Sequence, residues 1–128
     1  DEYGGTTGRK RRIGWLDLPA LKYSAQINGY TQLALCKLDK LDTFSEIKVC
    51  THYTLNGQII DFMPDAFLLK SVVPQYITLP GWKVSTRNIR CIRELPSNAK
   101  NYLHIIEKTV NVPITMVGVG PDRDEIAV

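Results

Sequence analysis

The sequence predicts an α/β fold built on a mixed sheet with flanking helices. Short apolar or alternating runs, typical of strands, are interleaved with two longer runs of helical periodicity. An Asn56-Gly57 pair between two strand-like runs indicates a tight antiparallel hairpin. The 128 residues suit one domain or one part of it, and two helices are too few to cover both faces of a sheet. We therefore expect a fragment of a larger domain.

A loop and a helix are expected first. Residues 1–12 are rich in Gly, Thr and Arg and carry few apolar side chains, which is typical of a loop. Residues 15–28 place apolar side chains on a rough helical stripe, with Asp17 as a cap and Pro19 tolerated in the first turn. Asn28-Gly29 is expected to end this helix.

Three strands are expected next. The apolar run at 31–36 predicts a buried strand that delivers residues 37–39 at its carboxyl end. Residues 46–53 alternate apolar and polar side chains, and residues 58–62 are expected to return antiparallel to them.

Strand-like and helical runs continue in the second half of the chain. They predict a short turn or irregular stretch at 63–70, a strand at 74–79, an ambiguous stretch at 83–95, a helix at 97–110 and a strand at 113–117. The 97–110 helix is the clearest, because its apolar side chains share one face and Ser97 can cap its N-terminus.

Most of the positive charge lies in one short run. The chain carries a net +3, but residues 9–12 are four consecutive basic side chains. Without them, 12 positive side chains stand against 13 negative ones, a net charge of −1. General adhesion to nucleic acid or to a membrane surface therefore loses most of its support. A basic nucleic-acid-binding module that uses Arg9–Arg12 stays open as the main alternative function, and a plain interaction or structural domain as a second alternative.

The cysteines and the lack of long apolar runs favour a cytoplasmic protein. No run approaches the roughly 18 apolar residues of a membrane span, and no signal-peptide pattern opens the chain. Cys36, Cys50 and Cys91 form no metal-ligand spacing, and their odd number favours reduced, mostly buried thiols over a 36–50 disulfide. The chain opens on Asp1 without Met, which we interpret as a cut edge, either of a longer protein or of a processed product.

The loop at 4–12 combines residue types that suit a small dianionic ligand. Its three glycines let the backbone approach a ligand closely, and its two Thr hydroxyls can donate or accept hydrogen bonds. Its guanidiniums can clamp a carboxylate or a phosphate with two bonds each. On composition alone, a solvated basic loop or a nucleic-acid contact patch has equal weight.

Two further segments suit a planar ligand. In Lys37-Leu38-Asp39, the carboxylate can accept hydrogen bonds from N1–H and the exocyclic amine of guanine, whereas adenine presents a repelling lone pair. The tripeptide alone is more often a surface turn with a Lys–Asp pair. The run 118–121, Gly-Val-Gly-Pro, lets a ring pack on bare backbone, or forms a plain tight turn.

Sequence motifs of several other enzyme classes are missing. The sequence contains no GxxxxGK[ST], no GxSxG and no HExxH. His52 and His104 are isolated, and we expect structural roles for them. Trp15 and Trp82 are expected to pack within the fold rather than to stack on single-stranded nucleic acid.

Taken together, several segments resemble the adenylosuccinate synthetase family. In the family's order they are Tyr3-Gly4-Gly5-Thr6-Thr7-Gly8-Arg9-Lys10-Arg11-Arg12, Gly14-Trp15-Leu16-Asp17, Leu35-Cys36-Lys37-Leu38-Asp39, Leu41-Asp42, Leu79-Pro80-Gly81-Trp82 and Gly120-Pro121-Asp122-Arg123. The resemblance covers essentially the whole chain. It implies that residues 1–128 are the C-terminal portion, somewhat under a third, of a single larger P-loop-NTPase-like synthetase domain.

This resemblance implies a GTP-dependent ligase of purine biosynthesis. The family joins IMP and L-aspartate into adenylosuccinate through 6-phosphoryl-IMP, releasing GDP and phosphate, with Mg²⁺ as the metal cofactor. Homodimers are expected. In the family the phosphate loop, the catalytic residues and the Mg²⁺ ligands lie in the N-terminal region. We therefore expect no catalytic or metal-ligating residue in this chain, and no synthetase activity from it alone.

The resemblance also assigns binding roles. The aspartate-binding loop corresponds to Gly5, Thr6, Thr7, Gly8, Arg9, Lys10 and Arg11. Within it, Thr6, Thr7 and Arg9 would hold the aspartate carboxylates, Arg9 would also reach IMP, and Arg11 would face GTP. The guanine-binding residues would be Lys37, Leu38, Asp39, Gly118, Val119 and Gly120. Cys36 stands where the family usually has Thr, which leaves the role of Asp39 intact but removes any role of a hydroxyl.

Overall fold

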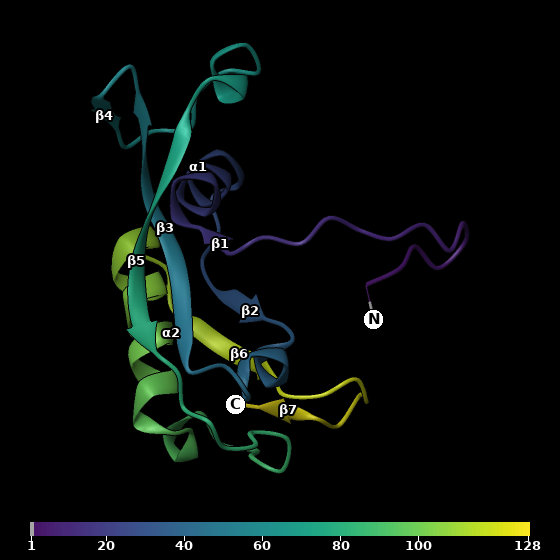
Figure 1. The fold of residues 1–128 in the computed structure, drawn as a ribbon. Coiled ribbons are helices and arrows are strands. Elements are labelled where there is room, and N and C mark those ends of the chain that lie inside the picture. The colour runs from purple at the N-terminus through teal and green to yellow at the C-terminus, as the bar shows by residue number, and fades with distance from the viewer. Residues whose placement is uncertain (1) are drawn as a thin grey trace.

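Two small sheets and two helices make up the fold, and the computed structural model describes residues 2–128 (Figure 1). The first sheet contains β1 (Leu16–Asp17), β3 (Glu46–Leu55), β4 (Gln58–Ile60) and β5 (Val73–Pro80). The second contains β2 (Leu33–Leu35), β6 (Ile114–Gly118) and β7 (Ile126–Ala127). The helices are α1 (Leu18–Asn28) and α2 (Ser97–Val110), with short 3₁₀ turns η1 (Leu38–Leu41), η2 (Leu68–Lys70) and η3 (Ile92–Glu94).

The long strand β3 organises the first sheet. It pairs antiparallel with β4 and β5 and parallel with the two residues of β1. The predicted hairpin at Asn56-Gly57 is confirmed, because both residues adopt positive φ, 51° and 79°, as a two-residue hairpin turn requires. The strands predicted at 46–53 and 74–79 are confirmed with slightly wider bounds.

In the second sheet, β2 and β6 run parallel, and β7 joins β6 antiparallel. The carboxyl ends of two parallel strands lie at the same edge of a sheet. Residues 37–39 follow β2, and residues 118–120 lie at the end of β6. The topology therefore places two of the predicted ligand-binding segments side by side, at the edge where α/β sheets commonly bind ligands.

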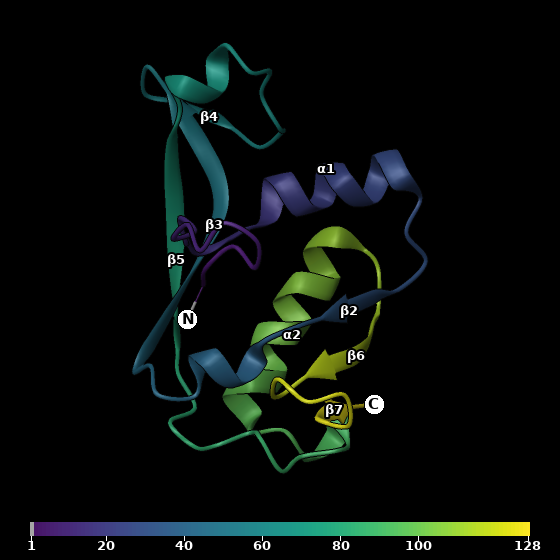
Figure 2. The same ribbon diagram turned by 90° about the vertical axis from the view of Figure 1, so that its right-hand side faces the viewer.

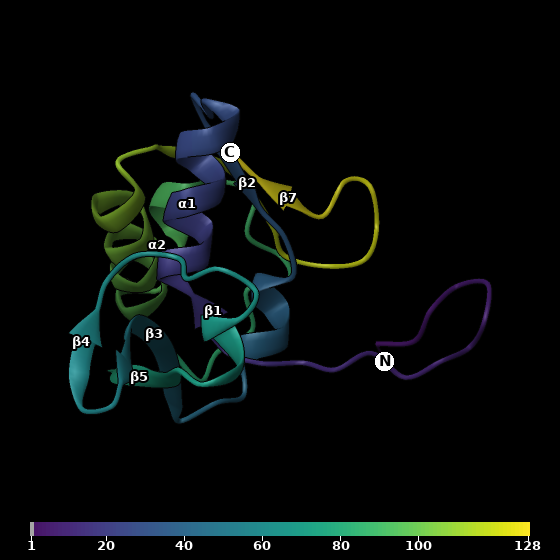
Figure 3. The same cartoon turned by 90° about the horizontal axis from the view of Figure 1, so that it is seen from above.

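A continuous core joins the helices to both sheets. Both helices lie on one side of the β3–β5 pair (Figures 2 and 3). The apolar face predicted for the 97–110 helix is confirmed, and its buried members are Ala99, Tyr102, Leu103, Ile106 and Val110. Burial raises the pKa of Tyr102 to about 12. Complete burial of Ile106 is typical of a side chain whose truncation to Ala costs about 2–5 kcal/mol of stability.

Several boundaries differ from the sequence-based expectation. The first helix begins at Leu18 instead of residue 15, because Leu16 and Asp17 pair with β3. Asp17 is nevertheless the predicted cap, since its Oδ1 accepts a 3.1 Å bond from the Ala20 amide. Gly29 ends the helix at φ 63°, as expected. The strand expected at 31–36 contains only Leu33–Leu35 and is not buried, because Ala34 is exposed.

Two other expectations are wrong. Ser97 does not cap α2; Pro96 occupies the N-cap position, and its carbonyl accepts from the Lys100 amide at 2.9 Å. The cysteines, free within residues 2–128, are not mostly buried: Cys50 is buried, Cys91 is half-buried and Cys36 is exposed. Helices of the described chain are all too short or too polar to cross a bilayer.

Candidate functional site

The glycine- and arginine-rich loop at 4–12 folds as a hairpin-like turn. The Gly4 amide donates to the Arg9 carbonyl at 2.8 Å, and the Gly8 amide donates to the Gly4 carbonyl at 2.8 Å. Tyr3 and Lys10 form an isolated antiparallel bridge. Gly8 adopts φ 62°, a conformation that favours glycine. The loop extends away from the two sheets (Figures 1 and 3), so its side chains are available to a ligand.

This loop lines a cavity of about 420 Å³ of its own. The cavity is lined by Gly4, Thr7, Arg9, Lys10, Arg11 and Arg12. Four cationic side chains and one hydroxyl therefore face a common space, which suits a ligand with two negative charges. Of the predicted aspartate-binding residues, the structure brings Thr7, Arg9, Lys10 and Arg11 together here. Gly5, Thr6 and Gly8 are exposed and do not line this cavity within the described chain.

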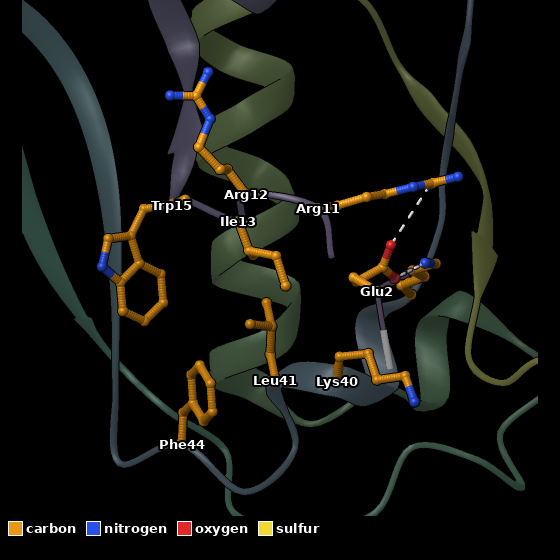
Figure 4. A pocket seen from close by; sticks show the side chains of 10 residues that line it. Glu2, Arg11, Arg12, Ile13, Trp15, Lys40, Leu41 and Phe44 are labelled. Carbon is orange, nitrogen blue, oxygen red and sulfur yellow. Dashed lines mark hydrogen bonds and ion pairs between the residues drawn. The ribbon is translucent and has the colours of Figure 1, made fainter. Parts of the chain in front are cut away.

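A larger cavity, of about 830 Å³, joins the base of this loop to the segment after β2. Its lining residues are Glu2, Arg11, Arg12, Ile13, Gly14, Trp15, Lys37, Lys40, Leu41 and Phe44 (Figure 4). Glu2 forms ion pairs with Arg11, at 3.6 Å, and with Lys37. Two segments predicted to bind different substrates thus meet at one cavity, although they lie in different parts of the sequence.

Of the lining residues of this cavity, only Arg11 and Lys37 were among the predicted site residues. The residues that the sequence prediction missed include Glu2, Trp15 and Phe44. Trp15 and Phe44 pack edge to face, with ring centroids 5.7 Å apart. The motif run from Gly14 to Asp17 included Trp15, but only the tertiary structure brings Phe44 to it. The expectation that Trp15 packs within the fold is only partly met, because it is 36% exposed at the cavity, whereas Trp82 is buried.

The turn that carries Asp39 is fixed by a buried neighbour. Lys37 adopts the left-handed conformation, with φ 65°, and Leu38 is 1% exposed in the core. This anchor leaves Asp39 half-buried. Its Oδ1 atom is buried and has no hydrogen-bond partner among residues 2–128, while Oδ2 lies 4.0 Å from the Lys40 ammonium. A buried carboxylate oxygen without a partner is costly, so a ligand that donates to it gains binding energy.

The backbone at 118–120 packs against this turn. A Cβ added to Gly118 would lie 3.4 Å from Cys36 Cα and 3.6 Å from the Lys37 amide nitrogen, at van der Waals distance, so the backbone of Gly118 lies directly beside this segment. The side chain of Val119 is fully buried in the core. Among the predicted guanine-binding residues, Val119 and Leu38 can therefore face a ligand only with their backbone.

Neither a cluster of metal-ligating side chains nor a histidine belongs to the two cavities within the described residues. Within residues 2–128, no three His, Cys, Asp or Glu side chains are grouped closely enough to hold a metal ion. His104 is exposed on α2, and His52 Nδ1 lies 2.9 Å from Thr51 Oγ1 in β3. Both lie outside the two cavities.

Comparison with known proteins identifies the family. The model of the family described as adenylosuccinate synthetase matches residues 1–127. The chain belongs to the adenylosuccinate synthetase family. Adenylosuccinate synthetase of Schizosaccharomyces pombe is 55% identical over 128 residues, and adenylosuccinate synthetase 1 of Methanosarcina acetivorans is 48% identical over 128 residues. These matches cover 99% and 100% of this chain but only 30% of each relative.

A solved synthetase has the same fold. The structure of fully ligated adenylosuccinate synthetase from Plasmodium falciparum superposes with a TM-score of 0.94 at 37% sequence identity. The match covers 99% of this chain and 31% of that enzyme. The predicted mixed α/β fold, as part of a larger synthetase fold, is thereby confirmed. The chain spans about 30% of the length of the curated relatives that it matches.

Proposed function

We propose that the protein containing this chain is an adenylosuccinate synthetase that joins IMP to L-aspartate at the expense of GTP. The γ-phosphoryl group of GTP would pass to the 6-oxygen of IMP. The aspartate amine would then displace that phosphate, giving adenylosuccinate, GDP and phosphate. In this proposal, the single domain to which the chain contributes places the guanine site and the aspartate site beside one cleft. Membership of the synthetase family supports the assignment.

The unpartnered oxygen of Asp39 is the observation that carries the proposal. A buried carboxylate needs donors, and the Watson–Crick edge of guanine offers two, N1–H and the 2-amino group. Adenine has an acceptor at N1 and would leave the carboxylate unpaired. The exposed Lys37 side chain can lie over the base, with its ammonium in water. The backbone of 118–120, packed against the Lys37 amide, supplies a second wall.

The cationic loop is proposed to bind the dicarboxylate. Thr7 and Arg9 line the smaller cavity, and a guanidinium can hold a carboxylate with two parallel bonds. Arg11 lines both cavities, which supports a role between the aspartate and GTP sites. Gly5, Thr6 and Gly8 contribute backbone and one hydroxyl around this ligand in the proposal. The confinement of the basic cluster to these cavities favours ligand binding over a nucleic-acid-binding module.

The described residues are proposed to bind and orient, while bond making depends on the rest of the enzyme. Mg²⁺ would neutralise phosphate charge during the phosphoryl transfer, and no ligand cluster for it exists within residues 2–128. Holding the base and the dicarboxylate in fixed positions lowers the entropic cost of bringing the reactants together. The family resemblance supports a homodimer, and the three free cysteines fit a reducing cytoplasm.

The proposed function predicts that an Arg9→Leu variant of the full-length synthetase uses aspartate poorly. Losing a charge-assisted bidentate contact of about 1.5–3 kcal/mol corresponds to about a 10- to 150-fold rise in the KM for aspartate. The KM for IMP should also rise, whereas the KM for GTP should stay within about twofold of the parent value. Steady-state formation of adenylosuccinate, with each substrate varied in turn, measures all three constants.

Arg93→Leu is the matched control for this experiment, because Arg93 is exposed on η3 and lines neither cavity. It should leave the three KM values unchanged. Failure of the parent enzyme to form adenylosuccinate from GTP, IMP and aspartate would overturn the proposed function. If the Arg9→Leu enzyme keeps the parent KM for aspartate, the loop is not part of the aspartate site.

A further inference from the structure

The irregular segment at 82–87, here called the bracing segment, contacts Asp42 and Glu125, which follow the two segments of the proposed guanine site in sequence. We propose that the bracing segment fixes the position of Asp39 relative to the backbone at 118–120. Asp42, Thr86, Arg87 and Glu125 are then positioning residues for guanine selectivity, although none of them needs to touch the base. This inference rests on the proposed function of the Asp39 turn.

The first contact holds the turn that carries Asp39. Asp42 follows η1 directly, and its amide donates to the Asp39 carbonyl at 3.2 Å. The Asp42 carboxylate accepts from Trp82 Nε1 at 2.6 Å, from the Thr86 amide at 2.7 Å and from Thr86 Oγ1 at 3.0 Å. Asp42 is 9% exposed and Thr86 is fully buried. Charge-assisted bonds in such a dry environment are strong and directional, so the end of the turn is fixed.

The second contact holds the segment that follows β6. Arg87 Nε donates to Glu125 Oε1 at 2.8 Å, and the Asp122 amide donates to Glu125 Oε2 at 2.9 Å. The hydrogen bond donated by the Asp122 backbone amide, together with the hydrogen bond from the Arg87 guanidinium, lowers the pKa of Glu125. The Glu125 carboxylate lies directly against Gly120, where an added Cβ would overlap it. The loop at 118–125 is thus folded around one carboxylate, and Arg87 ties that carboxylate to the bracing segment.

The two contacts are coupled because Thr86 and Arg87 are adjacent in sequence. A shift of the Asp39 turn must pull on Thr86, and a shift of the 118–125 loop must pull on Arg87. The Ile89 amide donates to the Thr86 carbonyl at 2.9 Å, so this part of the chain is itself a hydrogen-bonded turn. The buried Trp82 ring holds the start of the segment in the core, beside Tyr102 at a centroid distance of 6.2 Å. The bracing segment therefore sets the distance between the Asp39 turn and the backbone at 118–120.

Arg87→Ala and Thr86→Val test this role in the full-length synthetase. The readout is the ratio of kcat/KM for GTP to that for inosine triphosphate (ITP), whose base lacks the 2-amino group. Since a misplacement of about 1 Å weakens directional contacts severely, each variant should lower this ratio about 5- to 10-fold. The KM for aspartate should stay within about twofold of the parent value, because the cationic loop is not braced by this segment. Arg87→Lys, which keeps a donor toward Glu125, should recover part of the ratio.

Arg93→Ala is the control, and the melting temperature checks the fold of every variant. The side chain of Arg87 is 55% exposed, so its truncation leaves the core intact and decides the question even if Thr86→Val fails to fold. An unchanged GTP/ITP ratio in Arg87→Ala overturns the bracing role. The role is also overturned if Arg87→Ala lowers kcat/KM for GTP and for aspartate by the same factor. An Asp39→Ala enzyme measured in parallel separates the two proposals. If that variant keeps the parent GTP/ITP ratio, the guanine site itself is wrong.

Discussion

Replacing Asp39 by Ala in the full-length synthetase is expected to abolish the preference for GTP over ITP. The parent enzyme should prefer GTP about 10- to 150-fold, because ITP forfeits one charge-assisted bond of about 1.5–3 kcal/mol. Without the carboxylate, the 2-amino group has no partner, and the ratio should approach one. Discrimination against ATP should fall further, by up to about 10⁴-fold, since sites built on paired polar groups reject unpaired analogues strongly. Steady-state kinetics with the three nucleotides measures both ratios.

Asp61→Ala is the matched control for this comparison. Asp61 is an exposed carboxylate just after β4, outside both cavities. It should leave both nucleotide ratios at the parent values. A GTP/ITP ratio that survives in Asp39→Ala would mean that another group reads the 2-amino position. The buried orphan oxygen would then have no role in base recognition.

Gly81→Ala is expected to destabilise the protein strongly. An added Cβ would overlap the carbonyl oxygen of Phe44 and lie 2.8 Å from its carbonyl carbon. Backbone cannot give way as a flexible side chain can. A hydrogen bond of 2.8 Å from the Gly81 amide to the Ser45 carbonyl also keeps the backbone at residue 81 close to the backbone at residues 44–45. We expect a loss of about 3–5 kcal/mol, or failure to fold.

The melting temperature of the full-length protein measures this effect and should drop by about 5–10 °C. Gly14→Ala is the control, because a Cβ there would meet no atom of the described chain within 4 Å. It should change the melting temperature by about 1 °C or less. Equal melting temperatures for the Gly81→Ala variant and its parent would contradict the close packing of the segments around Phe44 and Gly81.

Sequence reasoning succeeded where a single segment carried its own chemical signal. The Asn56-Gly57 turn needs positive φ at two positions, and the α2 face repeats apolar side chains at helical spacing, so both could be predicted locally. The strands β1 and β7 have two residues each and exist only through pairing with β3 and β6. No local pattern marks such strands. The Ser97 cap failed for a similar reason, because Pro96 took the capping position one residue earlier.

The candidate site was predictable in its segments but not in its geometry. Residue types alone gave a dianion-binding loop and a solvated basic loop equal weight and favoured a surface turn at 37–39, so the predicted binding roles came from the family resemblance. Only the structure shows that Glu2 pairs with both Arg11 and Lys37, and that Asp39 keeps an unpartnered oxygen. The bracing segment fell in a stretch without helical or strand periodicity. It is ordered by side chains such as Asp42, about 40 positions away in sequence, and no sequence window of ordinary length contains both partners.

The arrangement of the two sheets is compatible with the two proposed ligand sites beside one cleft. The segments of the proposed guanine site lie at the carboxyl ends of the parallel strands β2 and β6. The cationic loop instead leads into β1, at the edge of the first sheet. The larger cavity lies where these two supports meet, with Glu2, Arg11 and Lys37 in its lining. Each proposed ligand site is therefore supported by its own sheet, while the ion pairs of Glu2 connect the two segments.

A crystal structure of the full-length synthetase with bound GDP tests the guanine site most directly. We expect N1 and the 2-amino nitrogen of guanine within about 2.7–3.2 Å of the Asp39 carboxylate, with Oδ1 as one of the acceptors. The Lys37 stem should lie along one face of the ring, and the backbone at 118–120 along its edge or other face. A guanine bound elsewhere, with the Asp39 oxygen still unpartnered, would contradict the account.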